Sequence, residues 1–453
     1  MKYTDLLVGG LCLFCACSSP QKNPIDYVDP FIGTGFHGHT YPGATTPFGA
    51  VQLSPDTRRG NWDASSGYHY SDSTILGFSH TQLSGTGCQD LGDVLLRPTT
   101  QPVRLEGEGD IFLPAAFSHD SEKATPGYYA VTLAEEQIKV ELAASTFAGM
   151  HRYTYLNDKD ASVIVDLTHI LNTDDFIYEA ELKQTADNEI VGMRRTRSWV
   201  DNQYIYFVLQ FSKPIQEWQQ LNDKQGVAHF GQEREVLAKV GLSIVSAENA
   251  RKNLLHDMPD FNFEAVCQQA KAAWEKELAI VNVKGGTEAQ RTNFYTAWYH
   301  SLVVPNRTND INNDYRRHDS SIAKTPEGKT TYSTFSTWDT FRAWHPLMTL
   351  TDTELVNNMI QSLLNMYEVT GELPIWPLSS GETGTMIGYH SASIIADAYM
   401  KGIRGYDAEK ALEAMVVSSN KNAKGSDFYT KYGFIPSNIK RESVSCLLEY
   451  AYD

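Results

Sequence analysis

The sequence predicts a fold in two parts, an antiparallel β-sandwich followed by an array or toroid of helices. From about Asp26 to Val245, short apolar runs are separated by turn residues, and no helical period lies between them. That spacing favours an antiparallel sandwich over βαβ units. After Asp260 the apolar residues recur with a helical period, beginning with Val266 and Ala270. The change of period near residue 250 therefore separates a β half from a helical half.

The β half contains apolar runs that have the length of strands. Each is rich in β-branched and aromatic residues and is bounded by turn residues. The clearest are Tyr129–Leu133, Ile138–Leu142, Ser162–Asp166, Tyr204–Phe211 and Leu237–Val245.

The helical half carries start signals and amphipathic spacing along most of its length. Helices are expected over Val266–Leu278 and Glu288–Val304, after Trp338, from the capping box Thr351-Asp352-Thr353-Glu354, and from near His390, Asp407 and Glu442. The last helix continues to Asp453 without a Gly, Asn or Pro stop signal. We therefore expect the helical half to be truncated.

The composition is that of an ordinary globular protein with an acidic balance. The 453 residues carry a formal net charge of -17, which disfavours nucleic acid and anionic membrane surfaces as partners. Aromatic residues make up 11% of the chain. That fraction suits a sugar-binding protein, and it suits a large sandwich core equally well.

The first residues resemble an export signal. Lys2 precedes an apolar run from Leu6 to Ala16, which is too short to span a bilayer, and Cys17 follows directly. A small residue before such a cysteine resembles a bacterial lipoprotein signal, with Cys17 as the lipidated residue. Phe14 fits that pattern poorly, so cleavage by the ordinary signal peptidase stays open. We expect an exported protein, periplasmic or on the outer-membrane or cell surface, that touches the membrane only through a lipid anchor.

Cysteine usage indicates neither a disulfide framework nor a zinc site. Three of the six cysteines lie in the export signal, and Cys88, Cys267 and Cys446 are spread widely through the rest. No C-x-x-C pair is present.

Two loop clusters in the β half contain residues that bear chemistry. The glycine-rich run from Gly33 to Gly43 includes His37 and His39, which are either a metal-binding pair or hydrogen-bonded loop histidines. The run from Ser84 to Asp90 contains glycines with no lysine after them, which excludes a phosphate-binding loop. Cys88 in that run is conceivable as a nucleophile, although no base is evident beside it.

Two further clusters lie in the helical half. In the first, Trp338 offers a stacking face, Asp339 can accept sugar hydroxyls, and Arg342 can orient that carboxylate. The alternative is an N-capping Asp339 and a core Trp338. In the second, Glu382 and His390 frame a loop that precedes a helix, and a structural histidine is equally open there.

Read in order, these clusters resemble family 92 of the glycoside hydrolases, the calcium-dependent exo-acting α-mannosidases common in gut Bacteroidetes. The resemblance extends from about Val28 to the end of the chain. The shared motifs are Asp29-Pro30-Phe31-Ile32-Gly33-Thr34, the run from His37 to Gly43, Ser66-Gly67-Tyr68, Phe78-Ser79-His80, the run from Ser84 to Asp90, Trp338-Asp339-Thr340 and Met386-Ile387-Gly388-Tyr389-His390.

The resemblance implies a β-sandwich packed on an (α/α)6 toroid, of which this chain would hold part. The implied boundaries are a signal at 1–17, a sandwich at 24–250, a helical linker at 251–285 and an incomplete catalytic domain at 286–453. It also implies hydrolysis with inversion, in which two carboxyl groups act on opposite sides of the glycosidic bond. A calcium ion is implied to engage the mannose hydroxyls, and hard oxygen ligands suit that ion.

The family's acid, base and calcium-ligand motifs are absent from these 453 residues, so the resemblance places them beyond Asp453. No catalytic residue or metal ligand is therefore assigned within the chain. The sugar-contacting residues carried over from the family come from both halves of the fold. They are Gly35, Phe36, Trp62 and Cys88 from the sandwich, and Trp338, Asp339, Arg342, Glu382 and His390 from the helical half.

Two departures from the family pattern bear on which mannoside linkage is preferred. Gly381 stands where the family usually has Asn, and Thr385 stands where it usually has Cys.

Two readings of function remain at this stage. The first is an exo-α-mannosidase, monomeric in its full-length form, that removes terminal α-1,2-mannose from N-glycans or mannan and is inactive in this truncated chain. The second is a non-catalytic, surface glycan-binding lipoprotein. The shared motifs argue against a third reading, a disaccharide phosphorylase on a similar fold.

Overall fold

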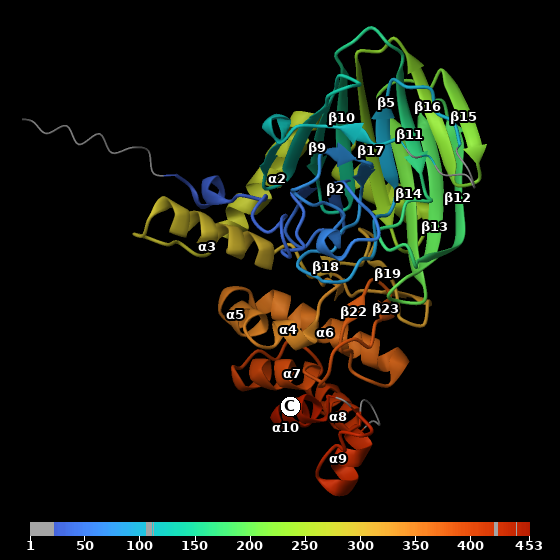
Figure 1. Ribbon diagram of the computed structural model, residues 1–453. Helices are drawn as coiled ribbons and strands as arrows, with labels where there is room; N and C mark the ends of the chain where they lie inside the picture. The colour runs from blue at the N-terminus through green and yellow to red at the C-terminus, as the bar shows by residue number, and fades with distance from the viewer. Residues whose placement is uncertain (1–21, 106–110, 112, 421–424, 441) are drawn as a thin grey trace, which may run out of the picture.

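The computed structural model describes residues 22–105, 111, 113–420, 425–440 and 442–453. The predicted export signal and Cys17 lie outside the described residues. A β-sandwich forms one end of the molecule and helices form the other (Figure 1). The predicted order, sandwich first and helices second, is confirmed.

Two large sheets form the sandwich, and all their strand pairs are antiparallel. The seven-stranded sheet has the order β1 (Ala44–Thr45), β2 (Gln52–Asp56), β4 (Gly77–Ser79), β5 (Leu95–Thr99), β11 (Ala161–Asp166), β16 (Gln225–Gly231) and β15 (Glu217–Asn222). The eight-stranded sheet has the order β12 (Phe176–Ala186), β13 (Glu189–Arg197), β14 (Gln203–Phe211), β17 (Glu235–Ser243), β10 (Ala148–Tyr155), β9 (Ile138–Ala144), β8 (Tyr128–Leu133) and β7 (Lys123–Thr125). All five predicted strands fall within these sheets, as β8, β9, β11, β14 and β17.

Short two-stranded sheets lie outside the two large sheets. They are β3 (Thr74–Ile75) with β6 (Ala115–Ala116), β18 (Asn306–Arg307) with β21 (Tyr332–Ser333), β19 (Asp314–Arg316) with β20 (Ile322–Lys324), and β22 (Pro377–Leu378) with β23 (Gly381–Glu382).

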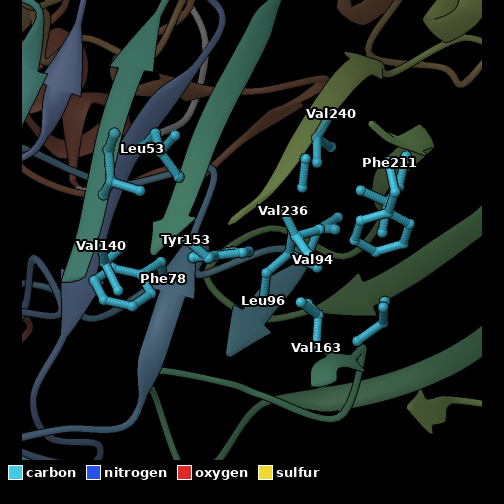
Figure 2. Packing of buried hydrophobic residues seen from close by; sticks show 14 of the residues in the cluster. Leu53, Phe78, Val94, Leu96, Val140, Tyr153, Val163, Phe211, Val236 and Val240 are labelled. Atoms are coloured by element: carbon cyan, nitrogen blue, oxygen red, sulfur yellow. The ribbon is translucent and has the colours of Figure 1, made fainter. Parts of the chain in front are cut away.

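The inward faces of the two sheets form one hydrophobic core. Leu53 and Phe78 come from the seven-stranded sheet, and Val140 and Tyr153 from the eight-stranded sheet (Figure 2). Successive strand residues point to opposite faces, so alternate residues of each strand enter this core. Fully burying one such aliphatic or aromatic side chain contributes about 1.5–3 kcal/mol, and truncating Phe211 to alanine would cost about 3–5 kcal/mol.

Helices α1 (Ala247–Asp257) and α2 (Phe263–Leu278) cover the outer face of the eight-stranded sheet. Leu254 and Val266 pack there with Met150 and Val208. Gly241 in β17 admits α1, because a Cβ at that position would collide with Leu254. The apolar period did not reveal α1, because two of its four buried residues are the polar Asn249 and Asn253.

The remaining helices are α3 (Glu288–Ser301), α4 (Thr337–Thr340), α5 (Trp344–Thr351), α6 (Thr353–Thr370), α7 (Ser391–Met400), α8 (Ala408–Ser419), α9 (Ser426–Tyr432) and α10 (Ser443–Tyr452). Asp407 caps α8 by accepting the N–H of Lys410, as expected for an N-cap. The capping box predicted from Thr351 is wrong. Thr351 ends α5, and the side chain of Asp352 caps α6 by accepting the N–H of Leu355 at 2.9 Å.

The helical half has a second core that also takes in residues from the start of the chain. Met359 and Leu363 of α6 pack with Ile394 of α7, and Tyr41 and Tyr68 from the sandwich loops join the same cluster. Those loops are therefore held between the two halves. Within the described ranges, no helix is long and apolar enough to cross a membrane.

Candidate active site at the interface of the two halves

A cavity of about 740 Å³ lies where loops of the sandwich face the helical half. One wall is the glycine-rich loop from Leu83 to Cys88. The opposite wall is formed by the segment from Thr334 to Thr340, together with Trp376, Thr385 and Met386, and Trp199 and Val304 complete the lining. Ligand pockets are commonly found at such interfaces.

Hydrogen bonds to neighbouring loops hold the glycine-rich wall in place. The N–H of Gly85 donates to the carbonyl of His39 at 2.7 Å, and Ser65 Oγ donates to the carbonyl of Thr86 at 2.7 Å. Trp62 Nε1 donates to the carbonyl of Gly87 at 3.0 Å. A Cβ at Gly87 would lie 3.1 Å from that indole nitrogen, so the glycine permits the close approach. Trp62 thus supports the cavity wall from behind and is half-exposed itself.

Gly35, Phe36 and Trp62 lie outside the cavity lining. Phe36 is 79% exposed, and its ring lies 3.9 Å from that of His37. The rings of His37 and His39 in turn lie 5.0 and 4.4 Å from that of Trp62. The structure therefore groups Phe36 and Trp62, through these histidines, into an aromatic surface that Trp62 joins to the cavity wall at Gly87, whereas Gly35 lies against Tyr70.

The two histidines of this surface have separate surroundings. His37 Nδ1 lies 2.5 Å from Asp63 Oδ1, whereas the His39 ring is buried against Trp62. Within the described part of the chain, no group of three or more His, Cys, Asp or Glu side chains could hold a metal ion. This geometry favours the reading of His37 and His39 as loop histidines.

Cys88 lines the cavity, but its environment does not favour a thiolate. Burial is the main cause that raises the pKa of the thiol to about 12, and the charges of Asp90 and Asp175 add to the effect. A protonated thiol is a poor nucleophile. Cys88 therefore acts as a small apolar wall residue.

Asp90 connects the glycine-rich loop to the hairpin that carries Trp199. Its carboxylate accepts Gln203 Nε2 at 2.9 Å and the N–H of Trp199 at 3.2 Å. Burial raises the pKa of Asp90 to about 6, although these hydrogen bonds act in the opposite direction. The loop and the hairpin thus reach the cavity as one unit.

On the helical side, Asp339 lines the cavity from the short helix α4. Ser336 is the N-cap of α4 and accepts the N–H of Asp339 at 3.3 Å, so the alternative reading of Asp339 as the N-cap is wrong. Trp338 is half-buried next to it.

Arg342 does not orient Asp339 as the sequence suggested. Helix α4 ends at Thr340, so Arg342 lies beyond the helix. It therefore does not share a helix face with Asp339. Its guanidinium lies 4.7 Å from the Trp338 ring centre, and Nη2 donates to Glu449 Oε1 at 3.1 Å.

Glu382 does not line the cavity, and its carboxylate binds backbone N–H groups of the loop that carries the cavity residue Trp376. Its carboxylate accepts the N–H groups of Ile375, Trp376 and Gly384 at 3.0, 3.0 and 2.7 Å. Trp376 is the cavity residue in this loop. The carboxylate therefore positions Trp376 from behind.

His390 is fully buried in the helical half. Its Nδ1 lies 2.7 Å from Asp453 Oδ1, and its ring stacks on Phe341 at 3.9 Å. Of the nine predicted sugar-contacting residues, the cavity lining brings together Cys88 and Asp339. Trp62 and Glu382 hold lining residues in place through hydrogen bonds, and Trp338 precedes Asp339 in the chain. Gly35, Phe36, Arg342 and His390 lie outside the lining.

Two cavity residues, Trp199 and Trp376, had no role assigned from sequence. The indole rings of Trp199 and Trp376 lie 4.8 Å apart, one from each half of the molecule. Trp199 Nε1 donates to Thr385 Oγ1 at 2.8 Å, which closes the interface. Gly381 lies against Val200 of the same hairpin, where a Cβ would come within 2.8 Å of the valine. Trp376 lies close in sequence to Glu382, in a loop region that the sequence had marked as a candidate site. No local sequence signal marks Trp199.

Comparison with known proteins gives one family for both halves. A profile described as the glycosyl hydrolase family 92 N-terminal domain matches residues 27–243, and one described as the glycosyl hydrolase family 92 catalytic domain matches residues 249–453.

Solved structures agree with these matches. A family GH92 α-mannosidase from Bacteroides thetaiotaomicron is 36% identical, with a TM-score of 0.90 over 95% of this chain and 62% of that one. A GH92 inverting mannosidase from Bacteroides thetaiotaomicron VPI-5482 is 28% identical, with a TM-score of 0.84 over 96% of this chain and 62% of that one.

A curated relative from Arthroderma benhamiae is named an uncharacterized secreted glycosidase. It is 26% identical over 521 residues, which cover 100% of this chain and 61% of the relative. The chain thus spans about three fifths of the length of the relatives it matches.

Proposed function

The chain belongs to glycosyl hydrolase family 92, and on that premise we propose that its interface cavity binds a terminal α-linked mannose as part of an exo-α-mannosidase. The observation that carries the proposal is the cavity of about 740 Å³, which is lined from both halves and contains Trp199 and Trp376, whose rings are in contact. Aromatic faces suit the C–H faces of a pyranose ring. The solved relatives named α-mannosidase support mannose as the sugar.

The chain's own residues would bind and orient the sugar. Asp339 lines the cavity and can accept hydrogen bonds from two hydroxyl groups. The two tryptophans would exclude water from the ring faces. The glycine-rich loop allows the sugar to approach the backbone. We propose that the sugar belongs to an N-glycan or a mannan and that the linkage cleaved is α-1,2.

Inversion requires two carboxyl groups about 6.5–9.5 Å apart. Among the described residues that line the cavity, Asp339 is the one carboxylate, and we assign it to sugar binding. We therefore propose no catalytic acid or base in this chain, and we propose that it is inactive alone.

Calcium is proposed as a cofactor of the family site, and the described residues do not by themselves fit it. Calcium takes six to eight oxygen ligands. The described side chains contain no group of three or more His, Cys, Asp or Glu that could hold a metal ion. The binding role proposed for this chain does not depend on the ion.

Titration calorimetry with α-1,2-mannobiose tests the proposal. Binding is expected for the parent chain, with affinity at least about tenfold weaker in Asp339→Asn because a charged acceptor is lost. Asp187→Asn, in the exposed turn after β12, is the matched control. An unfolding curve for each variant checks that the fold is intact. Equal affinity in parent and Asp339→Asn would contradict the assignment.

A second candidate function is glycan binding without hydrolysis, and the single carboxylate in the described lining favours it. The two functions differ in product, so release of mannose from mannobiose by the full-length protein, and its loss on chelation, separates them. Mannose release by the 453-residue chain would contradict the proposed inactivity.

We also propose export and lipidation at Cys17, supported by the apolar run before it and by the relative named as secreted. The proposed full-length protein is a monomer that acts on mannose-containing glycans. Membrane fractionation of cells making the parent and Cys17→Ser tests the anchor, because only the parent should sediment with membranes.

A further inference from the structure

A second aromatic surface lies on β12, the edge strand of the eight-stranded sheet. Phe176 is 57% exposed and Tyr178 is 43% exposed. Their rings lie 5.2 Å apart in an edge-to-face arrangement. Neither ring belongs to the cavity lining described above.

Contacts with guanidinium groups hold the Tyr178 ring in place, and Phe176 packs against that ring. Arg195 lies 4.8 Å from the ring centre of Tyr178 and 5.7 Å from that of Tyr204. Arg316, from β19, lies 4.0 Å from the ring centre of Tyr204. Arg195 Nε also donates to Asn202 Oδ1 at 3.2 Å. The aromatic rings are therefore positioned before any ligand arrives, which lowers the entropic cost of binding.

The strand register places this surface next to the cavity. Phe176 of β12 pairs with Arg197, the last residue of β13. Trp199, which lines the cavity, follows Arg197 by two residues in the chain. Paired Cα atoms lie about 5 Å apart and two extended residues span at most about 7 Å, so the Cα atoms of Phe176 and Trp199 lie within about 12 Å.

The glycine-rich wall of the cavity also places the start of β12 next to the cavity. Asp175 directly precedes Phe176, and its charge acts on the thiol of Cys88, which lines the cavity. In Figure 1, β12 lies along the outer edge of the sandwich, with one end near the helical half. The start of β12 thus lies at the cavity, and its exposed rings extend away from it.

We propose that Phe176 and Tyr178 form a distal sugar-binding surface for the pyranose residues that follow the terminal mannose of the same glycan chain. Exposed, pre-positioned rings next to a sugar site suit stacking on the C–H faces of further pyranoses. Arg195 and the exposed Glu179, which pair across the strands, supply hydrogen-bonding groups beside the rings. This inference rests on the proposed function of the cavity and extends it to longer substrates.

The test compares an α-linked mannose disaccharide with a hexasaccharide in titration calorimetry. The parent chain is expected to bind the hexasaccharide more tightly. The double variant Phe176→Ala, Tyr178→Ala is expected to lose about tenfold in hexasaccharide affinity, because two ring contacts are removed. Its disaccharide affinity should be unchanged.

Tyr399→Ala is the matched control, because Tyr399 is also exposed and lies 4.0 Å from the guanidinium of Arg404, but on α7. It should change neither affinity. Thermal unfolding of each variant reports on folding, which loss of exposed rings should leave intact.

Equal hexasaccharide affinity in the parent and the double variant would overturn the inference, as would equal losses for both sugars. An equal effect of Tyr399→Ala would overturn it too. A parent that binds neither sugar overturns the proposed function itself. A parent that binds both sugars equally overturns only the distal surface.

Discussion

The hydrogen bond between Trp199 and Thr385 is a direct polar link between the two halves at the cavity. Trp199 Nε1 and Thr385 Oγ1 lie 2.8 Å apart and are separated by 186 positions in the sequence. Both side chains line the cavity. The bond therefore fixes the indole face that we propose to contact the sugar.

Replacing Thr385 by valine is expected to lower the free energy of unfolding by about 1 kcal/mol, because the half-buried indole N–H loses its acceptor. Mannobiose affinity should fall as well, because the Trp199 ring is no longer fixed. Urea unfolding and calorimetry measure the two effects. Thr385→Ser keeps the hydroxyl group and should resemble the parent, so identical behaviour of the valine and serine variants would refute this role.

The same residues show how far sequence could specify the site. Asp339 and Cys88 were identified from their motifs, and both line the cavity. Glu382 was identified too, but its carboxylate binds backbone N–H groups. A carboxylate has the same sequence signature in either setting. Only the positions of the neighbouring donors decide its role.

Among the structural elements, β4 and β10 are linked across the sandwich core by buried histidines. His80, directly after β4, lies 3.0 Å from His151 of β10, measured between the Nε2 atoms. His80 Nδ1 lies 2.7 Å from the carbonyl oxygen of Val94, and Tyr153 Oη lies 2.9 Å from His151 Nδ1. Burial lowers the pKa of His80 to about 4 and that of His151 well below its usual range. Both rings are therefore neutral in the folded protein.

These histidines predict that the sandwich loses stability in mild acid. The unfolded chain takes up protons below a pH of about 6.5, whereas folded His80 resists protonation down to about 4. The free energy of unfolding should therefore fall as the pH drops from about 6.5 to about 4, by up to about 3 kcal/mol for His80. Above that window the effect is absent.

Urea unfolding at a series of pH values measures this dependence. His80→Gln cannot take up a proton, so its stability should vary less than that of the parent between pH 6.5 and 4. The difference between the two proteins separates the histidine effect from the opposite effect of Asp90, whose pKa is raised by burial. Parallel curves for the two proteins would contradict the prediction.

At the level of elements, local patterns located most strands and helices. The strands β8, β9, β11, β14 and β17 have the alternation or apolar runs that burial between two sheets requires. Helix α1 escaped because Asn249 and Asn253 lie on its buried side, where an apolar stripe was the expected signal. Those asparagines hydrogen-bond to the buried Asp310.

For the whole molecule, the helical half has apolar side chains on its surface. On α10, Val444, Leu448 and Tyr452 are 69, 65 and 68% exposed and recur at every fourth residue, so they share one face. Met400 of α7 and Leu350 of α5 are also strongly exposed. An exposed apolar face of this kind favours association with another apolar surface.

We predict that the 453-residue polypeptide self-associates in solution, or is poorly soluble, because of this face. Replacing Val444 and Leu448 by lysine should increase the monomer fraction in sedimentation experiments. Two lysines introduced at exposed acidic positions away from this face, Glu135→Lys and Asp187→Lys, serve as the control for added positive charge. A parent chain that is already a monodisperse monomer with one cooperative unfolding transition would refute the prediction.

The sequence by itself determined the order of the two halves, most of their strands and helices, the family, and the loops that reach the cavity. Each of these depends on periods and motifs within short segments of chain. Tertiary structure alone decided which side chains face the cavity. Trp199 meets Trp376 and Thr385 only because the hairpin after β13 packs against the loop around β22 and β23. Contacts between residues so far apart in the chain leave no trace in local spacing, because they depend on how whole elements pack.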